Sequence, residues 1–148
     1  MNSEERNTWV ALISSLIVNA WFYRQIWIMF HNGTSLAPDG LQIWARTVIW
    51  VIPVSIIVTI VLTILASMLY AVVTGERAAA FMKDERDRQF QLWGLGVTMI
   101  VCVAGFLAAM TSLALGTSGF VAFTLIYFGF SLGDLAGNLL KLALYRNR

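Results

Sequence analysis

The chain has 148 residues, of which 59% are hydrophobic and only 12% are charged. Soluble domains carry about 25% charged residues, so this composition, with a mean hydropathy of +0.75, indicates a single integral membrane domain over residues 1–148. The net charge of +2 is too small and too dispersed for direct nucleic acid binding, and the single cysteine, Cys102, excludes an internal disulfide and a dithiol redox mechanism.

Four apolar stretches are long enough to cross a bilayer. About 20 apolar residues in a helix span a hydrocarbon core about 30 Å thick. By this measure the sequence predicts transmembrane helices at about 8–30, 41–73, 92–115 and 119–144. The first is expected to be a retained helix because its flank is acidic, unlike that of a secretory signal. The second is longer than a bilayer requires and contains Pro53, which should kink it.

The positive charges in the connections predict the orientation. Cytoplasmic connections are enriched in Lys and Arg. The N-terminal tail, the second connection and the C-terminal tail carry Arg6, Arg77, Lys83, Arg86, Arg88, Arg146 and Arg148, whereas the segments 31–40 and 116–119 carry none. With four spans, all three basic segments fall on one side. We therefore expect an all-α integral membrane four-helix bundle with both the N-terminus and the C-terminus in the cytoplasm.

The first two spans carry polar residues that lipid disfavours. Ser15, Asn19 and Tyr23 form a stripe at helical spacing along the first span. Arg24, near the outer end of this span, and Arg46, near the start of the next, should lie at similar depth on adjacent antiparallel helices. One interpretation is an outer pocket for an anionic group, such as a lipid phosphate or a small carboxylate. The other is that each arginine snorkels to the headgroups.

The connector 76–91, with the sequence ERAAAFMKDERDRQFQ, has four acidic and four basic residues and no glycine or proline. Opposite charges four residues apart favour helix. We therefore expect the second and third spans to extend into a cytoplasmic helical hairpin. Either this hairpin is simply solvated, or it docks a soluble partner through Asp84, Glu85, Arg86, Asp87 and Arg88.

The run 83–88, followed at once by a membrane span, resembles a family of small, uncharacterised bacterial multi-span membrane proteins. These proteins have an Asp-Glu-Arg motif before a transmembrane helix, here Asp84, Glu85 and Arg86. Members are often encoded beside small helix-turn-helix regulators. The resemblance covers residues 83–115, and it implies a regulatory or sensory role through a soluble partner in the bacterial inner (plasma) membrane.

Small residues line the last two spans. Gly129, Gly133 and Gly137 form a stripe along the fourth span, and Gly105 and Ala109 form a weaker one along the third. Close backbone approach drives helix association in lipid. The short turn between these spans makes them antiparallel neighbours, so the stripes pack on each other within one chain or face a second copy in a homodimer.

The fourth span contains an acidic residue. Asp134 shares a face with Ser131, Asn138 and Lys141, and its depth is within about one turn of that of Asn19. An ionisable group in a span is a functional candidate. Asp134 is interpreted either as a carboxyl that relays a proton or senses a ligand, or as part of a structural clamp with Asn138 and Lys141.

These patterns favour a non-enzymatic protein. His31 is the only histidine, and neither a nucleophile–base pair nor a phosphate-binding loop can be identified, so we expect no cofactor and no metal. The expected function is regulatory or sensory, with membrane lipids, a cytoplasmic regulator protein and a second copy of the chain as partners. The alternatives are a small dimeric transporter or channel that uses Asp134, and an accessory subunit of a membrane complex.

Overall fold

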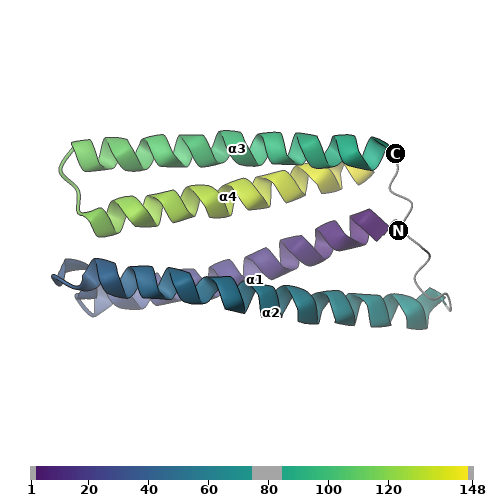
Figure 1. The fold of residues 1–148 in the computed structure, drawn as a ribbon, viewed down its shortest axis with the longest axis horizontal. Helices are drawn as coiled ribbons and strands as arrows, with labels where there is room; N and C mark the ends of the chain where they lie inside the picture. Colours follow the sequence, from purple (N-terminus) through teal and green to yellow (C-terminus); the bar gives the residue numbers. More distant parts are fainter. Residues whose placement is uncertain (1–2, 75–84, 147–148) are drawn as a thin grey trace.

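The computed structural model describes residues 3–74 and 85–146 of the protein. These ranges contain the α-helices α1 (Ser3–His31), α2 (Gly40–Thr74), α3 (Glu85–Ala114) and α4 (Gly119–Arg146), with the short 3-10 helix η1 (Thr34–Leu36) between α1 and α2 (Figure 1). The predicted all-α fold is confirmed. Residues 76–84 of the predicted connector lie outside the described ranges, and residues 85–91 form the first turns of α3.

Three of the helices, α2, α3 and α4, are long and apolar enough to cross a membrane. Their length and composition support the membrane class that the sequence predicted. Helix α1 has 29 residues but is not in this set, because Ser14, Asn19 and Arg24 interrupt its apolar sequence. Helix α2 continues in helical conformation on both sides of Pro53.

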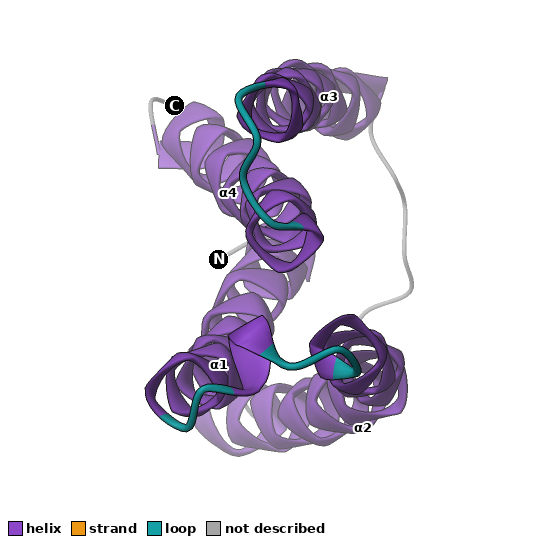
Figure 2. Cartoon of the chain, turned by 90° about the vertical axis from the view of Figure 1, so that its left-hand side faces the viewer, coloured by secondary structure: helices purple, strands orange, loops and turns teal. Residues whose placement is uncertain are grey.

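The four helices run side by side as two antiparallel hairpins, α1–α2 and α3–α4, and contact between α1 and α4 joins the hairpins. Viewed end-on, they follow one another in the order α3, α4, α1, α2, so that α2 and α3 lie at the two ends of the row (Figure 2). Both chain ends lie at the same end of the molecule (Figure 1). The bundle is therefore open on the side where α2 and α3 do not pack together.

The aromatic core joins the two hairpins in the half of the molecule away from the chain ends. Phe22 of α1 is fully buried, and its ring stacks on that of Tyr127 of α4 with centroids 3.7 Å apart. The same cluster contains Ile26, Met29, Trp44 and Phe120. Aromatic packing of this kind fixes the position of α1 between α2 and α4.

Glycines bring α3 and α4 into backbone contact. A Cβ on Gly105 would lie 2.5 Å from the Cα of Gly129, and one on Gly133 would lie 2.8 Å from the carbonyl oxygen of Thr98. A Cβ on Gly137 would lie 2.7 Å from the carbonyl oxygen of Gly94, so no larger residue fits at these crossings. Ala109 on α3 is fully buried. In this structure the glycine stripe of α4 packs on α3 of the same chain.

Candidate functional site

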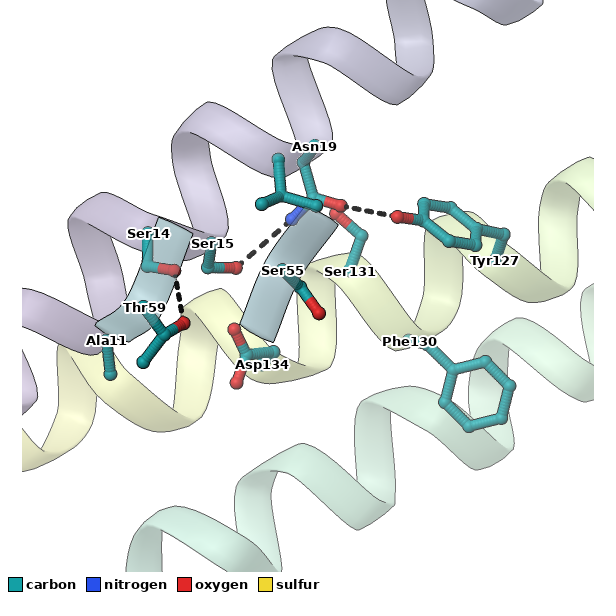
Figure 3. A pocket seen from close by; sticks show the side chains of 11 residues that line it. Ala11, Ser14, Ser15, Asn19, Ser55, Thr59, Tyr127, Phe130, Ser131 and Asp134 are labelled. Atoms are coloured by element: carbon teal, nitrogen blue, oxygen red, sulfur yellow. Dashed lines mark hydrogen bonds between the residues drawn. The ribbon is translucent and has the colours of Figure 1, made fainter. Parts of the chain in front are cut away.

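A cavity of about 360 Å³ opens between α1, α2 and α4 (Figure 3). Eight of its lining residues are polar and come from three helices: Ser14, Ser15 and Asn19 on α1, Ser55 and Thr59 on α2, and Tyr127, Ser131 and Asp134 on α4. Ala11, Val18 and Phe130 complete the lining. We call this cavity the polar groove. The polar groove therefore brings hydroxyl, amide and carboxyl groups together between helices, two of which, α2 and α4, are apolar enough to cross a membrane.

Side-chain hydrogen bonds join α1 to both of its neighbours in the polar groove. The Ser14 hydroxyl lies 2.7 Å from that of Thr59 on α2. The Tyr127 hydroxyl on α4 donates to Asn19 Oδ1 at 3.1 Å, and Asn19 Nδ2 donates to Ser15 Oγ at 3.1 Å (Figure 3). The polar stripe of α1 therefore faces the other helices of the bundle.

The partner of Asn19 was not identified from the sequence. The sequence predicts that Asn19 lies within about one turn of the depth of Asp134, but the side chain that bonds to Asn19 belongs to Tyr127, about two turns earlier on α4. A signal was present in the sequence, because Tyr127 is four residues before Ser131 and so extends the same polar face.

Asp134 presents a carboxylate to the polar groove and is exposed. Asn138 Nδ2 donates to its Oδ1 at 3.2 Å. Within residues 3–74 and 85–146, no Lys or Arg pairs with it and no group donates to Oδ2. Lys141 lies along α3 instead, since a Cβ on Gly94 would lie 2.9 Å from its Cγ and Cε. The carboxylate is thus held on one side by an amide and is open on the other.

Tyr23 and Ser131 meet at the boundary between α1 and α4. The Tyr23 hydroxyl is buried and interacts with Ser131, but without a well-formed hydrogen bond. Ser131 is itself buried. The ring of Tyr23 packs edge-on against those of Phe22 and Tyr127. The contribution of Tyr23 is therefore aromatic packing beside the polar groove.

Arg24 on α1 and Arg46 on α2 have different surroundings. Arg46 is exposed and lines a cavity of about 260 Å³ together with Trp21 and Trp50. Arg24 is exposed and is not among the lining residues of that cavity. Trp44, on the same helix as Arg46, is buried in the core and does not line this cavity.

The charged segment at the start of α3 is partly occupied by contacts within the chain. Glu85, Arg86 and Arg88 are exposed, whereas Asp87 is only 2% exposed. The Arg86 guanidinium lies 5.4 Å from the centroid of the Phe90 ring. Asp84 lies outside the described ranges. Among the docking residues predicted from the sequence, Asp87 is thus the one that is buried.

The groups that could hold a metal are sparse. In the part of the chain that the structure describes, no three His, Cys, Asp or Glu side chains come together as ligands. Cys102 contacts the carbonyl oxygen of Gly129 at the α3–α4 crossing, 3.9 Å away, and does not line the polar groove.

Comparison with known proteins gives no match: no family model, no curated protein and no solved structure is similar to this chain.

Proposed function

We propose that this chain is a non-enzymatic, regulatory or sensory protein of the bacterial inner membrane that binds a small organic cation in the polar groove. The observation that carries the proposal is the exposed carboxylate of Asp134, which faces a hydroxyl-lined cavity and has no cationic partner among the described residues. The groove combines this single carboxylate with hydroxyl and amide groups, which can bind a polar cation through several oxygen atoms.

The topology proposed for this function is four spans with both chain ends in the cytoplasm. Helix α1 has 29 residues, which at 1.5 Å per residue gives a length of about 43 Å, enough to cross a bilayer. Its polar residues Ser14 and Asn19 bond to other helices, so they need no water. Arg6, Arg86 and Arg146 lie at the end of the molecule that holds both chain ends, and the positive-inside rule places this end in the cytoplasm.

The charge of Asp134 favours a cationic ligand. A charged side chain at the centre of a span costs about 2.5–3.5 kcal/mol on insertion scales, and a bound cation offsets that cost. Tyr127 and Phe130 add aromatic faces, which attract organic cations. The hydroxyls of Ser55 and Thr59 lie across the groove on α2 and offer further oxygen atoms to a polar ligand.

Binding of tetraethylammonium to the protein in nanodiscs tests this proposal. We expect measurable binding by the wild type in isothermal titration calorimetry. Asp134→Asn should weaken it at least tenfold, equivalent to about 1.4 kcal/mol, because the amide keeps the shape but removes the charge. The matched control is Asp39→Asn, which changes an exposed carboxylate in the loop before α2 and should bind as the wild type does. Equal binding by Asp134→Asn, or no binding by the wild type, would contradict the proposal.

A regulatory role also requires a cytoplasmic partner, and we propose that the charged segment before and at the start of α3 docks it. Glu85, Arg86 and Arg88 are the exposed candidates there. The triple variant Asp84→Ala, Glu85→Ala, Arg86→Ala should fold normally but lose a soluble protein that co-purifies with the wild type in mild detergent. The variant Asp39→Ala, at the other end of the molecule, is the control. A partner retained by the triple variant would rule out docking at this segment.

Transport is the second candidate function, because Asp134 is exposed within the polar groove and so is reachable by a passing ion. Flux of tetraethylammonium into proteoliposomes that is lost in Asp134→Asn would favour a transporter. Binding without flux would favour a sensor.

A further inference from the structure

A third cavity, of about 330 Å³, lies between α1 and α2 at the end of the molecule that holds the chain ends. The residues that matter for its chemistry are Arg6, Trp9 and Ile13 on α1 and Leu69, Tyr70 and Val73 on α2. Arg6 and Ile13 are seven residues apart, so the cavity extends about 10 Å along α1. It combines one cationic group with a long apolar wall.

Arg6 is only 8% exposed, although it carries a permanent charge. Its guanidinium carbon lies 5.2 Å from the centroid of the Tyr70 ring, a cation–π distance. Among the described residues no carboxylate forms an ion pair with it. A buried guanidinium is stable only when an anion or hydrogen-bond acceptors compensate for the lost water. The planar fork of arginine matches a phosphate with two parallel hydrogen bonds.

The remaining walls fit a hydrocarbon chain. Ile13 on α1 and Leu69 and Val73 on α2 are exposed, and Trp9 is exposed beside Arg6. Tryptophan is enriched where a helix crosses the headgroup level of a membrane. A soluble anion would gain nothing from these apolar side chains, whereas a phospholipid would place its phosphate at Arg6 and an acyl chain along α1 and α2.

We propose that this cavity is a binding site for an anionic phospholipid, with the phosphate on Arg6, the glycerol region beside Trp9 and an acyl chain against Ile13, Leu69 and Val73. The site lies on the α1–α2 face and shares no lining residue with the polar groove. The inference is therefore independent of the ligand proposed for Asp134. Lipid held here would stabilise the α1–α2 hairpin at the membrane surface.

Native mass spectrometry of the delipidated protein in mild detergent, titrated with phosphatidylglycerol or phosphatidylcholine, tests the site. The wild type should retain phosphatidylglycerol in preference to phosphatidylcholine. Arg6→Gln should weaken phosphatidylglycerol retention about tenfold, whereas Arg146→Gln, which removes an exposed arginine at the same end of the molecule, should not. Equal retention by Arg6→Gln and the wild type, or equal retention of the two lipids by the wild type, would overturn the proposal.

Two further measurements cover the remaining outcomes. If Arg6→Gln does not fold, the variant Leu69→Trp tests the proposal, because it keeps Arg6 but fills the apolar part of the cavity. Leu69→Trp should lose phosphatidylglycerol. Retention of this lipid at the wild-type level would overturn the proposal. Inorganic phosphate at millimolar concentration should not displace the lipid. Full displacement by phosphate would mean that the site binds a free anion and not a lipid.

Discussion

At the scale of single residues, the polar side chains of α1 explain why this helix is less apolar than the other three. Ser14 bonds to Thr59 on α2, and Asn19 accepts a hydrogen bond from Tyr127 on α4. In a membrane such bonds replace water as partners for polar groups, and each contributes about 0.6 kcal/mol on average. Polar residues in α1 therefore join helices and at the same time create the polar groove.

The bond between Tyr127 and Asn19 gives a prediction for stability. Tyr127→Phe keeps the ring that stacks on Phe22 but removes the hydroxyl, which leaves Asn19 Oδ1 without its donor. We expect the free energy of unfolding to fall by about 0.5–1.5 kcal/mol, measured by titration with sodium dodecyl sulfate and circular dichroism.

The matched control for this change is Tyr23→Phe on the facing helix. The Tyr23 hydroxyl is buried without a well-formed hydrogen bond, so its removal should leave the free energy of unfolding almost unchanged. An equal loss in both variants would show that the Tyr127–Asn19 bond has no special part in stability.

The residue scale also shows what could be predicted from the sequence. The spacing of Ser15, Asn19 and Tyr23 placed them on one face, but a single sequence does not state the rotation of one helix about its axis relative to the next. This rotation decides that Tyr127, not Asp134, reaches Asn19. It also decides that Lys141 lies over Gly94 on α3, away from the carboxylate.

At the scale of the helices, glycine sets how closely α3 and α4 approach. Gly105 and Gly129 meet with their backbones in contact, and Thr98 reaches across to Gly133 with its hydroxyl 3.0 Å from the carbonyl oxygen. The stripe of α4 was visible in the sequence. Gly94, which provides the space for Lys141, was not singled out because it stands outside the four-residue repeat on α3.

Substitution of a contact glycine should weaken the α3–α4 hairpin. In Gly105→Ala the new methyl group would lie 2.5 Å from Gly129 Cα, so the helices must separate. We expect a loss of about 1–3 kcal/mol in the free energy of unfolding, the usual cost of overpacking, in the same detergent titration.

Gly96 offers a control on the same helix. A Cβ at Gly96 would meet nothing within 4 Å, so Gly96→Ala should be neutral or stabilise the helix by up to about 1 kcal/mol. If Gly105→Ala proved as stable as Gly96→Ala, the close crossing of α3 and α4 would not be what holds the hairpin together.

At the scale of the whole molecule, the helix order α3, α4, α1, α2 leaves the bundle open between its outer helices. The sequence predicted the number of helices and their limits to within a few residues at most ends. It could not predict this order, because the choice between a closed and an open arrangement depends on how side chains from distant segments fit. In this arrangement Asp134 is exposed and lines the polar groove between α1, α2 and α4.

The central claim is that α1 crosses the membrane, since α1 supplies the wall of the polar groove that faces Asp134. Labelling of single cysteines in a Cys102→Ala background with a membrane-impermeant maleimide tests it directly. Ser3→Cys lies at the start of α1 and Ser35→Cys lies in the connection to α2. We predict that Ser35→Cys reacts in intact spheroplasts and that Ser3→Cys reacts only after permeabilisation. Reaction of both positions from the same face would mean that α1 does not cross, and it would contradict the account.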